Sequence, residues 1–330
     1  MILLYLTPYF LMLFGVVTGA VGTMLMYTLI GLGIAGIGLG IMHDANHGAY
    51  SKKQKVNDRI GQVLNFVGGH AVTWKIQHNV LHHSFTNIDG MDEDIDPGPI
   101  MRFNPHKKRY GLHRLQHLYG WFIYGLMTFF WLTFKDFLQL ARYRKMGLTK
   151  QFEGKSIWRL TLDVILWKVF YYGYAMVIPF IFFEVEWYWI VAGWFWSLFI
   201  SGLILGMIFQ PAHVVPETVF PMPDADHNMD NNWAIHQMLT TTNFAPKSRI
   251  FSWYVGGLNY QVEHHLFPNI CHVHYRKLAP IVEACAKEHG VPYYSERTFA
   301  GAVIKHIRLL RDLGKYDDLP ETSGARITPA

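Results

Sequence analysis

Apolar residues gather in two long pairs of segments, with polar stretches between and after them. The first 42 residues carry no charged side chain. Because a membrane-spanning helix needs roughly 20 apolar residues, this run is long enough for two helices joined by a turn. A second apolar pair is interrupted only by the short polar segment 184–186. The pattern predicts an all-α integral membrane protein whose four transmembrane helices form two hairpins, at about 2–20, 22–42, 162–183 and 187–209.

The turn of the first hairpin is expected among Gly15, Gly19 and Gly22, since glycine adopts the positive φ angles of tight turns at little cost. A cleaved signal peptide is the alternative interpretation of this region. It lacks support, because no basic segment precedes the apolar run and no polar cleavage zone follows it. We therefore expect the first apolar run to stay in the membrane.

Composition agrees with a membrane protein, and the distribution of charge predicts which segments lie on the cytoplasmic side. Hydrophobic residues make up 51% of the chain and charged residues 16%, against about 25% charged residues in soluble domains. Lysine and arginine lie in the long middle segment and after residue 246, while both predicted turns lack them. By the positive-inside rule these two basic regions are cytoplasmic. The basic residues are not part of a nucleic-acid recognition motif, so we expect no nucleic-acid partner.

Histidine is the unusual component, with 18 residues in the chain. Seven of them fall in three clusters, HDANHG at 43–48, QHNVLHHSFTN at 77–87 and QVEHHLF at 261–267. Residues four apart share one face of a helix, whereas adjacent residues point about 100° apart. The first two clusters therefore each aim two imidazoles together, and neighbouring histidines are able to serve different ions. The clustered histidines are His43, His47, His78, His82, His83, His264 and His265.

Clustered imidazoles indicate metal binding rather than packing, because a buried polar ring without a partner is costly. Neutral imidazole suits Zn, Cu, Fe or Ni, and the ligand type alone does not choose among them. Seven nitrogen ligands exceed what one ion uses, so two ions are expected. Only two cysteines occur, which argues against a thiolate site, and the HEXXH motif of zinc hydrolases is absent.

The segment LYGWFIYGLMTFFWLTF at 118–134 has two interpretations. Hydropathy alone favours a fifth membrane span. A fifth crossing would place the third histidine cluster on the opposite side of the membrane from the first two, and no shared site could then form. We therefore expect an interfacial helix at about 117–136, with its Trp and Tyr side chains at headgroup level.

The three clusters resemble a known family. HDANH, HNVLHH and QVEHH are similar to the three histidine boxes of the membrane fatty acid desaturases, and the likeness covers nearly the whole chain. The stretch GGLNYQVEHHLFP, with Gln261 where many desaturases have His, resembles the front-end (Δ5/Δ6-type, linoleoyl-CoA desaturase-like) members. Those enzymes insert a double bond between an existing one and the carboxyl end. The segment FQPAHV at 209–214 resembles the part of the family that supplies a further iron ligand, here His213.

This resemblance implies a set of site residues. It implies two Fe ions, with O2 as co-substrate, and Gln261 as a weak or water-mediated ligand. Asn259, Asp44 and His236 are further candidates for weak ligation or for contacts that support the ligands, and the acidic run DGMDEDIDPG is either such a support or a solvated loop. The implied iron ligands are His43, His47, His78, His82, His83, His213, His264 and His265.

The resemblance also implies partners. Many front-end enzymes carry a fused cytochrome b5 domain with an HPGG haem motif, which this sequence lacks, so electrons are expected from an external ferredoxin or cytochrome b5. The substrate is a fatty acyl chain linked to CoA, to a carrier protein or to a lipid. We expect one membrane desaturase domain over 1–318, with a cytoplasmic helical cap that holds the di-metal site, and a disordered tail at 319–330.

Two alternatives remain. A di-iron fatty acyl or lipid hydroxylase would use similar histidine boxes and differ in the fate of the oxygen. A membrane metal transporter would place ionisable residues inside its spans along the ion path. Asp163 and Lys168 are the only obvious charged residues within the second apolar pair, so transport is the weaker alternative.

Overall fold

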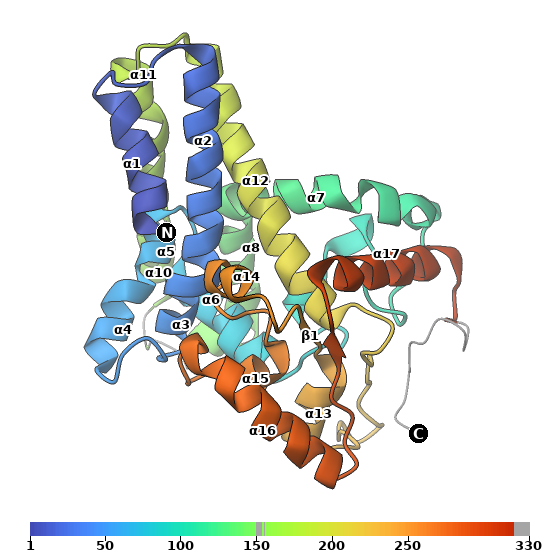
Figure 1. Cartoon of the computed structure of the whole chain (residues 1–330). Helices are drawn as coiled ribbons and strands as arrows, with labels where there is room; N and C mark the ends of the chain where they lie inside the picture. Colours follow the sequence, from blue (N-terminus) through green and yellow to red (C-terminus); the bar gives the residue numbers. More distant parts are fainter. Residues whose placement is uncertain (150–153, 155, 320–330) are drawn as a thin grey trace. The chain divides into compact units, whose positions relative to one another are not determined.

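The computed structural model describes residues 1–149, 154 and 156–319, and they group into two compact units (Figure 1). The first unit comprises Met1–Ile76 and Phe122–Gly206, and the second comprises Gln77–Trp121 and the described part of Met207–Ala330. The predicted disordered tail lies outside the described residues, apart from Leu319, which is buried. The expectation of a single domain over 1–318 stays a prediction.

The first unit is helical throughout its described elements. Helices α7 and α12 and the π-helical turn η2 continue from one unit into the other. The elements are α1 (Ile2–Leu13), α2 (Gly19–Gly36), η1 (Ile37–Ile41), α3 (Met42–Asn46), α4 (Gln54–Gly61), α5 (Val63–Phe66), α6 (Ala71–Lys75), η2 (Ile76–His82), α7 (Gln116–Phe130), η6 (Trp131–Lys135), α8 (Asp136–Lys145), α10 (Ile157–Tyr172), η7 (Gly173–Val177), α11 (Ile178–Phe182) and α12 (Trp187–His213).

Two helical hairpins form the first unit, as the hydrophobic pattern predicts (Figure 1). Gly15 and Gly19 have φ angles of 64° and 74° and make the first turn, whereas Gly22, the third candidate, lies inside α2. A β-carbon added to Gly15 would lie 3.2 Å from a carboxylate oxygen of Glu184, in the second turn. The two turns therefore lie at the same end of the unit.

Three helices in the described part of the chain are long and apolar enough to cross a membrane. They are Gly19–Asn46, Ile157–Phe182 and Trp187–His213, which contain or overlap the predicted spans 22–42, 162–183 and 187–209. The predicted span 2–20 contains α1, whose 12 residues are fewer than the roughly 20 that a crossing needs. The helix that begins with α7, predicted to be interfacial, is not among the three.

Small residues and paired charges hold the first unit together. A β-carbon on Gly33 would lie 2.8 Å from the Tyr5 amide nitrogen, so α1 and α2 are in backbone contact, as small residues allow between membrane helices. Two charged residues of α10, Lys168 and Asp163, are paired. Lys168 donates to Asp136 at 2.5 Å, and Asp163 lies 3.1 Å from His70. These contacts tie α10 to neighbouring helices and do not mark an ion path.

The second unit contains a two-stranded parallel ladder, β1 (Asn243–Phe244) with β2 (Ser295–Glu296). The fold is thus mostly helical rather than strictly all-α. Val262, Met238 and Val282 pack together and join α15, α13 and α16. Its other elements are η3 (Glu93–Ile95), η4 (Gly98–Ile100), η5 (Gly111–Leu115), α13 (Trp233–Thr240), α14 (Arg249–Tyr254), α15 (Gln261–Leu266), η8 (His272–His274), α16 (Tyr275–Glu288) and α17 (Phe299–Lys315).

Candidate metal centre

The second histidine cluster lies on a π-helical turn, η2, and not on a regular α-helix. The His83 amide donates to the carbonyl of His78, five residues back, at 3.0 Å, which is the hydrogen bond of a π-turn. The wide turn keeps His78 and His82 on one side, with ring centroids 5.1 Å apart. The His82 and His83 rings are inclined by 80°, with centroids 5.6 Å apart, and both lie near the ring of His265.

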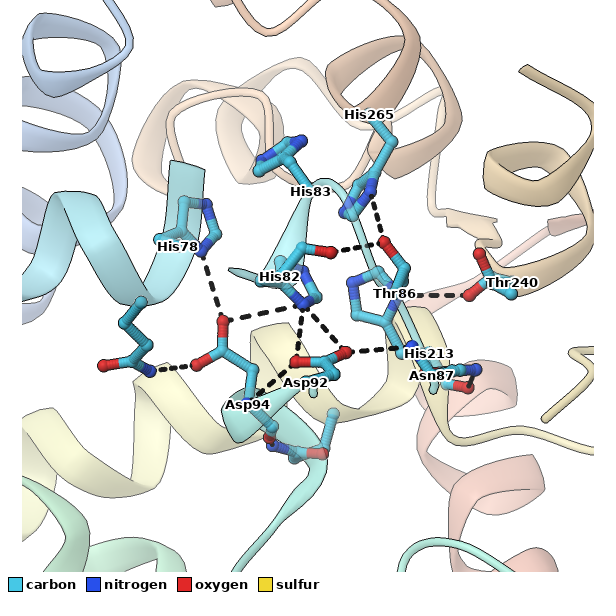
Figure 2. Close-up of polar contacts among 12 residues, drawn as sticks. His78, His82, His83, Thr86, Asn87, Asp92, Asp94, His213, Thr240 and His265 are labelled. Carbon is cyan, nitrogen blue, oxygen red and sulfur yellow. Dashed lines mark hydrogen bonds and ion pairs between the residues drawn. The ribbon is translucent and has the colours of Figure 1, made fainter. Parts of the chain in front are cut away.

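Histidines from three parts of the second unit converge around this turn (Figure 2). His82, His213 from the end of α12 and His265 from α15 bring their ligand nitrogens within 4.8 Å of one another, and all three are buried. His83, His264 and His265 form a second such group. These two groups of histidines share His265.

Hydrogen bonds hold one nitrogen of each ring in the first group. His82 Nδ1 lies 3.0 Å from both oxygens of Asp92, His213 Nδ1 lies 3.1 Å from the carbonyl of Thr240, and His265 Nδ1 lies 2.8 Å from Oε1 of Gln237. Metal-bound imidazoles usually donate their second N–H to such acceptors, which sets the tautomer and the ring orientation.

The Nε2 nitrogens of the same three rings are available to bind a metal. Nε2 of His82, His213 and His265 is buried and has no hydrogen-bond partner among the described residues. A buried polar atom without a partner is costly. Three such atoms close together, each on a ring whose Nδ1 has an acceptor, are the donor set that an imidazole-preferring ion needs. The residues therefore fit a bound metal.

Carboxylates from the acidic run are part of this arrangement. Asp92 is buried and also accepts from the Asn87 and Asp94 amides, each at 2.9 Å. Asp94 lies 3.2 Å from His78 Nδ1 and accepts a short hydrogen bond from Gln77. Asp96 lies 2.8 Å from Lys107, and both side chains are half-buried. The run is thus split between support of the histidines and a half-buried ion pair.

The electrostatics of the site follow from this burial. Burial lowers the pKa of His82, but the carboxylates of Asp92 and Asp94 more than reverse the effect and raise it to about 8. Burial alone would raise the pKa of Asp92, whereas its contact with His82 and the Asn87 amide lowers it. Burial and the surrounding imidazoles hold the pKa of His265 well below its ordinary value. His265 is therefore neutral at physiological pH, the form that binds a metal.

The first histidine cluster is built within the first unit. His43 lies in α3 and His47 follows its end, with ring centroids 4.7 Å apart. Both rings contact the edge or face of Trp74, at 5.5 and 5.7 Å between centroids. The two imidazoles therefore share a side of the helix, as their spacing predicts. Asp44, between them, is buried.

The other candidates differ in their contacts. His236 Nε2 lies 2.8 Å from the carbonyl of Thr86, so this ring is engaged with the backbone. Asn259 is buried, with Nδ2 3.4 Å from the carbonyl of Ala245 and Oδ1 without a hydrogen-bond partner in the described chain. Gln261 is buried at the start of α15, and its Nε2 likewise lacks a partner there.

Two residues that the sequence did not single out connect the histidine clusters. Gln237 accepts from His265 and from the Thr86 hydroxyl at 2.8 and 2.9 Å, and donates to the His83 carbonyl at 3.1 Å. Asn87, with φ 62°, donates to the carbonyls of His213 and Val219, each at 3.0 Å. Asn tolerates this left-handed conformation better than most residues, which is the only local signal for its role.

Comparison with known proteins agrees with the arrangement. A family model described as "Fatty acid desaturase" matches residues 18–297. An sn-1 linoleoyl-lipid 6-desaturase from Arthrospira platensis is 37% identical over 300 residues, covering 89% of this chain and 78% of the relative. A protein of the same name from Synechocystis sp. is 34% identical and covers 87% and 79%. An acyl-lipid (8-3)-desaturase from Physcomitrium patens is 34% identical and covers 94% and 64%.

The family match includes all three histidine clusters and His213, and the two linoleoyl-lipid 6-desaturases align over most of their own length. The buried imidazoles of the second unit are consistent with a metal site. The chain belongs to the fatty acid desaturase family.

Proposed function

We propose that this fatty acid desaturase inserts a cis double bond into a lipid-linked fatty acyl chain at a histidine-ligated di-iron centre. The observation that carries the proposal is the convergence of His82, His213 and His265, whose Nδ1 atoms are held and whose Nε2 atoms are buried without partners in the described chain. When bound, the two irons, with O2 and two reducing equivalents, supply the oxidising power to remove two hydrogens from adjacent methylene carbons, which side-chain acid–base chemistry does not provide.

The proposed ligands combine geometry and resemblance. Within the second unit, mutual proximity supports His78, His82, His83, His213, His264 and His265. His43 and His47 are proposed on the histidine-box resemblance. Gln261 and Asn259, both buried with an amide atom that lacks a partner in the described chain, are proposed as positions for a weak or water-mediated contact.

The protein residues of this site orient the imidazoles and exclude bulk water. Asp92, the Thr240 carbonyl and Gln237 each accept from one imidazole, which leaves the opposite nitrogen available for a metal. All three imidazoles are almost completely buried, so bulk water is kept away from the place where the substrate hydrogens are removed. This exclusion limits side reactions.

Membrane placement and electron supply complete the proposal. Three helices suited to a bilayer agree with a substrate dissolved in lipid. We propose four spans, with α1 completing the first hairpin, and histidine boxes on the cytoplasmic side. Electrons come from an external ferredoxin or cytochrome b5.

The relatives suggest the substrate class. Two of them are named for action on linoleoyl lipid at position 6, and a third is an acyl-lipid desaturase. We infer a lipid-linked polyunsaturated chain as substrate and front-end insertion of the new bond, at position 6 of a linoleoyl group.

Expression in bacteria that also produce a plant-type ferredoxin and its reductase tests the proposal. Cells are fed oleate or linoleate, and polar lipids and acyl-CoA are separated before gas chromatography and mass spectrometry. We expect a 6,9,12-triene that appears first in the polar lipids and is absent from the His82→Ala control. A new hydroxy acid would favour the hydroxylase. Purified protein that binds no iron and yields no product would overturn the proposal.

A further inference from the structure

A basic pocket lies on the second unit, where η5 meets α17. Its volume is about 450 Å³, and Arg114, Arg311, Lys315 and Tyr316 line it. The three cationic side chains are exposed, and Lys315 Nζ lies 4.9 Å from the centroid of the Tyr316 ring. None of these residues belongs to the metal centre.

The fold places these charges together through a close helix contact. A β-carbon added to Gly314 would lie 2.0 Å from the His113 carbonyl oxygen, so the backbones of α17 and η5 touch. Gln116 fixes the same contact, since its Nε2 donates to the Leu310 carbonyl at 2.7 Å. As a result Arg114, next to His113, faces the end of α17, where Arg311 and Lys315 stand one turn apart.

The pocket has little negative charge to balance it. Within the described part of the chain, Asp312 is the one acidic side chain that forms an ion pair with any of the three cations, at 3.6 Å from Arg311. Nearby Asp317 is already paired with Arg109, at 2.8 Å. Clustered like charges repel one another and attract an anion, so the pocket is suited to a phosphate.

Exposed leucines close to Arg114 in the sequence indicate the source of that phosphate. Leu112, Leu115 and Leu118 flank Arg114 in sequence and are 49%, 59% and 64% exposed. A soluble phosphate or an acidic protein surface would leave these side chains in water, whereas a phospholipid covers them with its acyl chains while its headgroup meets the cations. We propose that this pocket binds the headgroup of an anionic phospholipid and docks the second unit on the membrane surface.

The proposal is tested with the full chain reconstituted in phosphatidylcholine vesicles that contain a minor fraction of photoactivatable phosphatidylglycerol. After illumination, labelled peptides are mapped by mass spectrometry. We expect labelling of 110–118 and 308–316 that falls by more than about tenfold in Arg114→Gln/Arg311→Gln/Lys315→Gln, because each cation near an anionic surface contributes several-fold to binding. The matched control Lys52→Gln/Lys53→Gln/Lys55→Gln removes three exposed cations elsewhere and is expected to keep the labelling.

Competition separates the possible ligands. Unlabelled phosphatidylglycerol should displace the label, and inorganic phosphate should not. Displacement by both equally would make the pocket a free-phosphate site and overturn the proposal. Equal labelling of the triple variant and wild type would also overturn it. If ferredoxin in addition reduced the triple variant more slowly, the pocket would be assigned to an acidic electron carrier.

Discussion

At the scale of single residues, the site depends on acceptors that hold the imidazoles. Asp92 is buried, receives His82 Nδ1 at 3.0 Å and is itself held by the amides of Asn87 and Asp94. Asp96, four residues later, contacts Lys107 instead. The two carboxylates therefore provide a test and its control within one loop.

Replacing Asp92 by Asn should weaken metal binding by about 10- to 100-fold, the usual effect of losing the acceptor behind a ligating imidazole. An amide is a poorer acceptor than a carboxylate and no longer stabilises the charge that develops on a metal-bound His82. Iron content by elemental analysis and affinity by competition with a chelator measure the change. Asp96→Asn should keep wild-type affinity. Equal affinities for all three proteins would contradict this role of Asp92.

Gln237 and its neighbour His236 are distinguished by a second pair of substitutions. Gln237→Leu removes the acceptor for His265 and the donor to the His83 carbonyl, so we expect at least about tenfold weaker metal binding. His236→Gln keeps a donor that can reach the Thr86 carbonyl and should retain the metal. Loss of iron in His236→Gln with a normal melting temperature would instead show that His236 is a ligand.

At the scale of elements, glycine is needed where the backbones of two helices touch, because a larger side chain would push them apart. Gly314 on α17 is the clearest case, because its missing β-carbon leaves room for the carbonyl of His113. Gly173, at the start of η7, has no atom within 4 Å of such a β-carbon. Two helical glycines thus differ only in what lies beside them.

Gly314→Ala should lower the free energy of unfolding by about 1–3 kcal/mol, the cost of overpacking, although alanine is the better helix former. Gly173→Ala should be neutral or slightly stabilising. Thermal unfolding in detergent, followed by circular dichroism, checks both. A melting temperature for Gly314→Ala equal to wild type would mean that α17 can shift away from η5 at no cost.

At the scale of the whole molecule, metal binding and stability are linked. An ion that binds only the folded chain stabilises it, and about 100-fold excess over Kd contributes about 2.7 kcal/mol. Buried imidazoles with unpartnered Nε2 atoms in the described chain make this linkage strong here. The effect should centre on the histidine clusters and on His213, which ends one of the helices suited to a bilayer.

Removing the metal with a chelator should therefore lower the melting temperature of the purified protein by about 5 °C or more. The double variant His82→Ala/His265→Ala should melt at the same temperature with and without chelator. His289→Ala, at an exposed position, should keep the full wild-type shift. A chelator effect that survives in the double variant would place the stabilising metal elsewhere.

Several features could be predicted from the sequence because they depend on neighbours in the chain. Apolar length predicted the hairpins, and three of the four spans correspond to helices able to cross a membrane. Spacing predicted that His43 and His47 lie together, and their ring centroids are 4.7 Å apart. The family followed from the same motifs and agrees with the matched relatives.

Other features needed the tertiary structure. The sequence offered Asp92, Asp94 and Asp96 as equals, and only the folded loop assigns Asp92 to His82 and Asp96 to Lys107. It drew attention to His236, whereas Gln237 contacts the clusters. Arg114 and Lys315, about 200 residues apart, meet because α17 contacts η5 at Gly314 and through Gln116. Helices and ligand spacing follow from local geometry, whereas hydrogen-bond partners and charge clusters depend on contacts through space between distant segments.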